Sequence, residues 1–153
     1  MPGALPSAQG LVWGFMSSEL LGGARRVLFV HAHPDDETLA TGGLIAALAD
    51  AGVEVFLLTG TRGEQGEIVP GSFTVPGAVI AGTLSAEQAE ALAQHRIAEV
   101  RAAARTLGVC RVAFLGEEGA RAAGLTPRRY TDSGMVWLDA AETLAGPGPD
   151  AGP

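Results

Sequence analysis

The sequence predicts an α/β fold, a Rossmann-like open parallel sheet with flanking helices. Apolar, β-branched runs at residues 26–31, 53–59 and 111–115 have the length and composition of buried strands. Amphipathic stretches separate these runs, so strand, helix and strand follow one another as right-handed βαβ units. Because ligands of such sheets bind beyond the carboxyl ends of the strands, we expect the functional residues there.

Both predicted helices have recognisable ends. The first runs from Asp36 to Ala51 and is stopped by Gly52, which suits the position just after a helix. The second begins with a capping box at Ser85 and is closed by Gly108. Apolar residues repeat at helical spacing, as Leu44, Ala47, Leu48 and Ala51 in the first helix and as Ile97, Val100, Ala104 and Leu107 in the second.

The 153 residues have room for one domain with an extension at each end. We expect an N-terminal extension at residues 1–24, the domain at 25–145 and a disordered, Gly/Pro-rich tail at 146–153. Two long aperiodic loops and one short helix complete the domain, at residues 60–84, 116–134 and 138–144. Loops of this length within a compact domain are usually functional or mobile.

Composition and charge exclude several classes of function. A hydrophobic content of 47% supports a packed core, whereas a formal net charge of −7 disfavours a nucleic-acid or anionic membrane surface. The apolar run at residues 11–16 is too short to cross a bilayer, so no membrane span is expected. Cys110 is the single cysteine, which excludes an intrachain disulfide and indicates a reducing, cytoplasmic setting. A homo-oligomer is compatible with all of these features.

The first strand ends in a cluster of side chains suited to catalysis. Its apolar residues give way abruptly to His33, Asp35, Asp36 and Glu37, with Pro34 fixing the turn. An imidazole beside two adjacent carboxylates suits metal binding and general-base chemistry. The alternative is helix capping, because acidic side chains favour the first turn of any helix.

The segment Ala32-His-Pro-Asp-Asp-Glu37 resembles the signature of the PIG-L/LmbE family of zinc-dependent N-acetylglucosaminyl deacetylases. The resemblance runs from about residue 26 to residue 135 and includes further segments at 59–67, 95–99 and 131–135. Several matches in the same order are far more specific than a single motif. The resemblance implies a Zn²⁺ cofactor and hydrolysis of an N-acetyl amide on a small amino-sugar conjugate.

The resemblance also assigns roles to the turn after the first strand. His33 and Asp36 match two of the family's zinc ligands, and Asp35 matches the general base that takes a proton from the attacking water. Within the family, the segment 130–135 favours resemblance to the GlcNAc-inositol deacetylase of mycothiol synthesis. The mycothiol-conjugate amidase is a close alternative within the same class.

Three further residues are implied in substrate binding. Arg96 matches a family arginine that reaches into the sugar pocket, although an ion pair with Glu99 on the same helix accounts for it equally well. Asp132 matches an acid that binds substrate hydroxyls, and as a lone loop aspartate it would otherwise be a turn residue. Glu67 is assigned to the same mouth.

The remaining histidines have plainer interpretations. His31 lies two residues before His33 on the strand and is expected to be a satisfied core histidine, with a supporting role behind His33 as the alternative. His95 is expected on the surface of the second helix, because the matching family position is not a ligand.

One departure from the family's pattern affects the metal site. The family's third zinc ligand is a histidine in a His-Pro-Asp-His-like motif on a later segment, and no such motif occurs in this sequence. The later strands of the sheet are missing as well, so we interpret the chain as the N-terminal part of a longer enzyme. The alternative is a catalytically inactive Rossmann-like binding module with an incomplete metal site.

Overall fold

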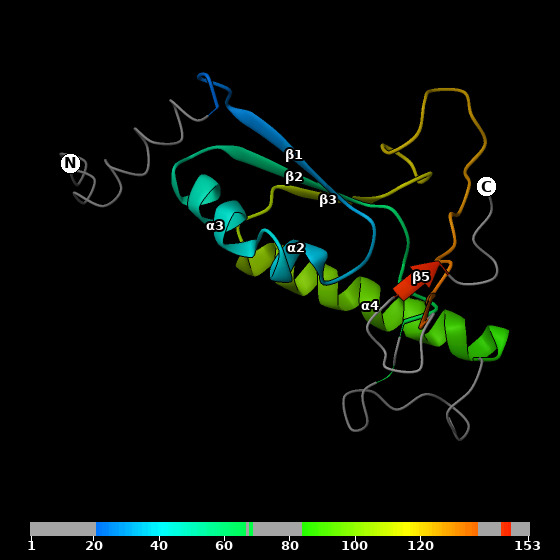
Figure 1. The fold of residues 1–153 in the computed structure, drawn as a ribbon. Coiled ribbons are helices and arrows are strands. Elements are labelled where there is room, and N and C mark those ends of the chain that lie inside the picture. The colour runs from blue at the N-terminus through cyan, green and yellow to red at the C-terminus, as the bar shows by residue number, and fades with distance from the viewer. Residues whose placement is uncertain (1–20, 67, 69–83, 138–144, 148–153) are drawn as a thin grey trace.

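The computed structural model describes residues 21–66, 68, 84–137 and 145–147, and shows a parallel sheet with helices packed against it (Figure 1). The strands of the main sheet are β1 (Arg26–His31), β2 (Glu54–Thr59) and β3 (Arg111–Phe114). The helices are α2 (Asp36–Leu39), α3 (Gly42–Asp50) and α4 (Ala86–Thr106). The predicted α/β fold with a parallel sheet is confirmed, and the helix predicted at residues 138–144 lies outside the described residues.

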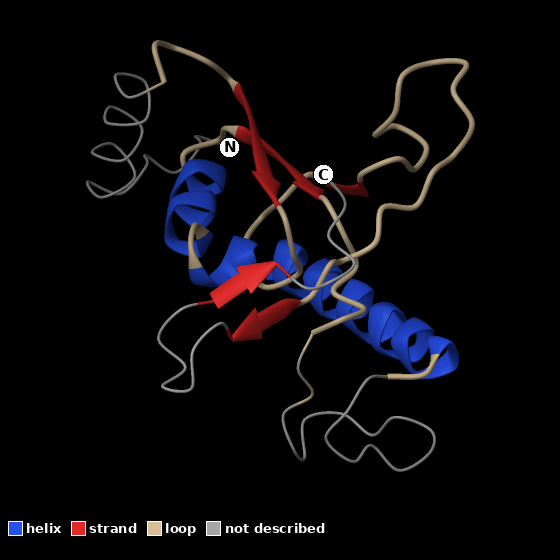
Figure 2. Cartoon of the chain, turned by 45° about the vertical axis from the view of Figure 1, so that its right-hand side comes forward, coloured by secondary structure: helices blue, strands red, loops and turns tan. Residues whose placement is uncertain are grey.

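The three strands pair in sequence order, and both pairs are parallel. Val27 lies opposite Val55 in the first pair, and Leu57 lies opposite Val112 in the second. Right-handed crossovers that add strands in one direction place their helices on one face of the sheet. Accordingly, α3 and α4 lie on the same side of the three strands (Figures 1 and 2).

The core lies between this face of the sheet and the helices. It contains two clusters of buried side chains. The first joins α3 to the sheet and consists of Ile45, Leu48 and Val55. The second joins α4 to the sheet and consists of Leu57, Ile97, Val100 and Phe114. Burying one such side chain stabilises the fold by about 1.5–3 kcal/mol. The predicted stripe on α4 is confirmed, since Ala104 is buried with the others and Leu107 packs against the α3 cluster.

The ends of α4 agree with the sequence. Ser85 Oγ accepts a hydrogen bond from the Gln88 backbone N–H, and the Gln88 side chain accepts one from the Ser85 N–H. Gly108 follows the helix with φ 78°, a conformation that glycine adopts without strain.

The prediction of one continuous first helix is wrong, because the chain forms α2 and α3 with Thr41 between them at φ −132°. Thr41 Oγ1 donates a 3.2 Å hydrogen bond to the Glu37 carbonyl oxygen. The following glycines, Gly42 and Gly43, have low helix propensity and do not favour continuation through this point.

The buried face of α3 differs in part from the predicted one. Gly42, Ile45 and Leu48 point into the core, whereas Leu44, part of the predicted apolar repeat, is 45% exposed. The repeat at residues 44–51 therefore identified the helix, and it predicted the inner face correctly at Leu48 but not at Leu44.

The other face of the sheet carries exposed apolar side chains. Leu28 and Val30 of β1 are 58% and 63% exposed. The prediction of a buried strand at residues 26–31 is wrong for one face of β1, because the described helices cover the other face only. Among the described strands β1 pairs with β2 alone, so it stands at one edge of the sheet.

Beyond β3 the chain forms a long loop and then a small antiparallel pair, β4 (Met135–Trp137) with β5 (Ala145–Pro147). Gly146 and Pro147, predicted to begin a disordered tail, are paired with β4 instead. At the other end, Leu21 was predicted to belong to an extension but packs against the α3 cluster. Within the described ranges, no helix is long and apolar enough to cross a membrane.

Candidate active site

The turn between β1 and α2 has an unusual backbone conformation. Asp35 has φ 91° and ψ −28°, and no other non-glycine residue in the described ranges has a positive φ. A left-handed conformation costs an L-residue roughly 1–2 kcal/mol, and aspartate tolerates it better than most. Glu37, which is 1% exposed, stabilises the turn because its Oε2 accepts a 3.0 Å hydrogen bond from the Asp35 N–H.

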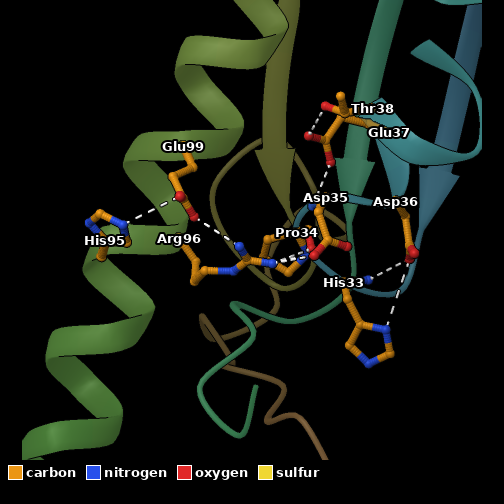
Figure 3. Close-up of polar contacts among 9 residues, drawn as sticks. All are labelled: His33, Pro34, Asp35, Asp36, Glu37, Thr38, His95, Arg96 and Glu99. Carbon is orange, nitrogen blue, oxygen red and sulfur yellow. Dashed lines mark hydrogen bonds and ion pairs between the residues drawn. The ribbon is translucent and has the colours of Figure 1, made fainter. Parts of the chain in front are cut away.

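His33 and Asp36 lie together on one side of this turn (Figure 3). The His33 backbone N–H donates to Asp36 Oδ2 at 3.0 Å, and His33 Nδ1 lies 3.9 Å from the same oxygen. Their side chains are 49% and 38% exposed. An imidazole nitrogen and a carboxylate oxygen are therefore accessible to solvent together just beyond β1.

The carboxylate of Asp35 points the other way, towards α4 (Figure 3). Arg96 Nη2 donates to Asp35 Oδ2 and, at 2.9 Å, to the Pro34 carbonyl oxygen. Arg96 Nη1 donates to Glu99 Oε2 at 2.9 Å, so the ion pair expected within the helix is present. The contact with Asp35 was not predicted, because it joins residues far apart in the sequence.

The charge of Arg96 is secured by these partners. Burial acts to lower the pKa of Arg96, but its hydrogen bonds to Asp35 and Glu99 outweigh this effect and raise the pKa above its ordinary value. The guanidinium therefore stays protonated, and the structure places it beside Asp35.

Asp132 reaches the site from the loop after β3. Its side chain is 7% exposed, and Oδ1 lies 3.3 Å from His33 Nε2. The same oxygen accepts a 3.0 Å hydrogen bond from the Gly134 N–H, as in an ordinary aspartate turn. The structure thus brings Asp132 and His33 together, which their separation in the sequence could not reveal.

Two buried residues of the loop after β2 were missed from the sequence. Glu64 is 5% exposed and accepts hydrogen bonds from the backbone N–H groups of Arg62 and Asp132, each at 3.2 Å. Arg62 is 7% exposed, pairs with Glu117 and lies 5.7 Å from the Phe114 ring centre. Both residues follow a strand directly and lie in the segment 59–67 that resembles the family, but neither signal singles out Arg62 or Glu64.

The other candidates lie away from the site or outside the described residues. His31 Nε2 is 2.9 Å from Thr41 Oγ1, so this histidine has a partner in the scaffold, as a structural role requires. His95 lies on α4 with Nε2 3.3 Å from Glu99 Oε1, and its side chain is 33% exposed. Glu67 is outside the described residues.

The donor chemistry fits a zinc ion. Catalytic zinc sites use imidazole and carboxylate ligands, and His33 and Asp36 supply one of each. Asp132 lies on the other ring nitrogen of His33, where metal-bound histidines commonly contact a carboxylate. Within the described ranges, no three or more His, Cys, Asp or Glu side chains are arranged so that they could hold a metal ion together.

A pocket opens on the α4 side of Asp35. Its lining includes Pro34, Asp35, Leu39, Arg96 and Val100. The pocket thus lies beside Asp35 and Arg96, and neither His33 nor Asp36 is among its lining residues.

Fold and site together define a parallel α/β protein with a metal-type donor pair and a separate carboxylate at the carboxyl end of its first strand. Residues 28–145 match the family model of PIG-L, GlcNAc-PI de-N-acetylase, and the chain belongs to this family.

Curated relatives share the same segment. A 1D-myo-inositol 2-acetamido-2-deoxy-α-D-glucopyranoside deacetylase of Kineococcus radiotolerans is 42% identical over 130 residues, which cover 85% of this chain and 31% of the relative. The deacetylase of the same name from Actinosynnema mirum is 46% identical over 111 residues, covering 72% of this chain and 33% of the relative. The chain thus spans about a third of the length of these relatives.

A solved structure has the same fold. The N,N′-diacetylchitobiose deacetylase from Pyrococcus horikoshii superposes with a TM-score of 0.53 at 24% sequence identity. The match covers 87% of this chain and 42% of that protein. At this identity the likeness concerns the fold alone.

Proposed function

We propose that this chain supplies metal-binding and general-base residues of a zinc-dependent deacetylase acting on a GlcNAc-type sugar conjugate, such as GlcNAc-inositol. The observation that carries the proposal is the His33–Asp36 pair beside Asp35, in a chain of this family. The names of the relatives support the substrate class, because they are deacetylases of a GlcNAc-inositol. The single cysteine supports a reducing, cytoplasmic setting.

The two neighbouring aspartates have different tasks in this proposal. His33 and Asp36 hold the zinc ion, which when bound polarises a carbonyl and lowers the pKa of water. Asp35 accepts the proton of the attacking water. The opposite directions of the two carboxylates support this division, because Asp36 faces His33 while Asp35 faces Arg96.

The substrate-binding assignments need one revision. Arg96 already bonds to Asp35, Pro34 and Glu99, so we assign it first to holding Asp35 in place. To bind the sugar conjugate as well, the Arg96 guanidinium would have to share one of these hydrogen bonds with the substrate. Glu67 keeps its proposed place at the substrate mouth.

A chimaera gives a direct test. This chain replaces the matching third of the Actinosynnema mirum deacetylase, and acetate release from GlcNAc-inositol is measured with zinc and after its removal by a chelator. We expect zinc-dependent release. The Asp35→Asn chimaera should bind the same amount of zinc and lose about 10²–10⁴-fold in rate, as expected for loss of a general base.

The outcomes separate the alternatives. A folded, zinc-loaded chimaera that releases no acetate from GlcNAc-inositol or from a mycothiol conjugate would contradict the proposal and favour a non-catalytic module. Release from the conjugate alone would assign the chain to the amidases. Loss of zinc from the Asp35→Asn chimaera would reverse the roles of the two aspartates.

A further inference from the structure

We propose that Glu64 and Asp132 are positioning residues that orient His33. Asp132 holds the imidazole by its Nε2–H, and the buried Glu64 holds Asp132. The inference deepens the proposed function, on which it rests for the role of His33 as a ligand. It adds a support for that ligand drawn from two loops distant in the sequence.

The first step is the contact between Asp132 and His33. Asp132 Oδ1 lies 3.3 Å from His33 Nε2, while His33 Nδ1 is the nitrogen on the Asp36 side. Both carboxylates are acceptors only, and Asp132 is the nearer one, at 3.3 Å from Nε2 against 3.9 Å for Asp36 from Nδ1. In a neutral imidazole this difference favours the proton on Nε2. The lone pair then remains on Nδ1, next to the carboxylate of Asp36.

The second step is the support beneath Asp132. Glu64 Oε1 accepts the Asp132 N–H and Oε2 accepts the Arg62 N–H, each at 3.2 Å. One buried carboxylate therefore joins the loop after β2 to the loop after β3 at the backbone of Asp132. Hydrogen bonds to a charged group are stronger than neutral ones, which makes this a firm connection.

The third step is the degree of fixation. Asp132 has a backbone bond to Glu64 on one side and a bond from the Gly134 N–H to its own Oδ1 on the other. Its carboxylate is thus directed at His33 by the protein before any ligand arrives. An exposed aspartate that binds a substrate hydroxyl does not need its carboxylate fixed in advance by other residues. The carboxylate of Asp132 is fixed next to His33, so the geometry points to a role in orienting the His33 ring.

The experiment reads the tautomer of His33 directly, without metal or substrate. Long-range ¹H–¹⁵N NMR of residues 1–153 distinguishes Nδ1–H from Nε2–H imidazoles, at a pH of about 8 where an ordinary histidine is neutral. We expect His33 as the Nε2–H form in the wild type and in Asp132→Asn, which keeps an acceptor oxygen. Asp132→Ala and Glu64→Ala should shift it towards a tautomer mixture.

Two controls accompany these variants. Glu118→Ala removes an exposed acid from the same loop region and should leave His33 unchanged. His31 serves as an internal reference, because Thr41 donates its hydroxyl proton to Glu37 and must therefore accept from His31 Nε2. Its tautomer should be the same in all variants.

Zinc affinity gives a second readout, measured by competition with a chelator. Asp132→Ala should weaken zinc binding by about 10–100-fold, as loss of a partner behind a histidine ligand commonly does. Asp132→Asn should recover part of this loss. An unchanged tautomer and an unchanged zinc affinity in Asp132→Ala would overturn the inference, and this comparison stands even where Glu64→Ala fails to fold.

The two proposals fail in different ways. If the chimaera is inactive while the His33 tautomer shifts in the variants as expected, the proposed orientation of His33 is supported and the proposed deacetylase function is contradicted. If the chimaera is active while the tautomer is unaffected, Asp132 is a substrate or turn residue and only the orientation falls.

Discussion

The backbone at Asp35 determines how the role of its side chain is tested. Asp35 has a left-handed backbone conformation. Its N–H donates a hydrogen bond to Glu37, and its carboxylate accepts one from Arg96. Asparagine tolerates this conformation, whereas alanine is destabilised by the steric clash that the left-handed conformation imposes on its Cβ. A comparison of the two substitutions therefore separates chemistry from backbone strain.

We expect Asp35→Asn to slow deacetylation in the chimaera by about 10²–10⁴-fold while the free energy of unfolding stays nearly unchanged. Asp35→Ala should also lose activity and should in addition lower the free energy of unfolding by about 1–2 kcal/mol. Urea unfolding and bound zinc, measured on both variants, check this. Equal stability of the two variants would show that the turn is not strained.

Arg96→Ala should impair hydrolysis of the sugar conjugate and of a minimal N-acetyl sugar by similar factors. The reason is that Arg96 holds Asp35 and the Pro34 carbonyl, which both substrates need in place. Steady-state kinetics on the two substrates provide the measurement. A higher KM for the conjugate alone, with the minimal sugar unaffected, would instead assign Arg96 to binding the distal part of the substrate.

At the scale of the elements, Gly116 ties the loop after β3 to itself. It has φ 84°, its carbonyl accepts from the Arg128 N–H, and an added Cβ would overlap the Arg128 carbonyl oxygen at 1.9 Å. Gly124, in the same loop, has φ 81° but no atom within 4 Å of an added Cβ. An alanine at either position would adopt a strained positive φ, and only at Gly116 would its Cβ also clash.

We therefore expect Gly116→Ala to open this loop and Gly124→Ala to leave it closed. Amide hydrogen exchange at residues 116–134 gives the readout, and faster exchange is expected in Gly116→Ala alone. Because the loop delivers Asp132, the zinc affinity of Gly116→Ala should fall as well. Equal exchange in both variants would mean that the clash is relieved by a small backbone shift.

The loop after β3 also contacts α4 through the ion pair of Arg129 with Glu90, and this contact should depend on pH. Hydrogen bonds from Gln94 and then from Arg129 lower the pKa of Glu90 below its ordinary 4.5. Because the folded-state pKa is the lower one, the stabilisation is present above the ordinary value and is lost as pH falls through the folded pKa. We expect exchange around Arg129 to rise in that acidic range, and Glu90→Gln to remove the pH dependence.

The sequence predicted elements better than their contacts. The limits of β1 and α4 followed from an apolar run and a capping box, which are local signals. The break at Thr41 was missed, because it depends on a hydrogen bond to Glu37 that competes with continued helix.

The candidate site shows the same limit. The His33–Asp36 pair could be predicted because both residues belong to one turn. The contacts of Asp132 with His33 and of Arg96 with Asp35 join separate elements, and no local pattern contains them. Glu64 illustrates this most clearly, since its partners are backbone groups that any residue provides.

At the scale of the whole molecule, the uncovered face of β1 should govern behaviour in solution. Exposed Leu28 and Val30 lie on an edge strand, and apolar edges promote association between chains. We expect residues 1–153 to self-associate with rising concentration, and Leu28→Thr with Val30→Thr to reduce this without unfolding. Sedimentation velocity and circular dichroism provide the measurements, and unchanged association in the double variant would place the contact elsewhere.

The strand order of the sheet also determines the order in which parts of the site can form during synthesis of the chain. In the described part of the main sheet, β2 pairs with β1 and β3 pairs with β2, so these three strands can be added in the order in which they are synthesised. His33 and Asp36 lie close together as soon as their turn forms, whereas Asp132 is translated only after β3. The proposed ligand pair is consequently assembled early and its proposed orienting carboxylate late, so under this proposal a zinc ion met during synthesis would encounter an imidazole that is still free to rotate.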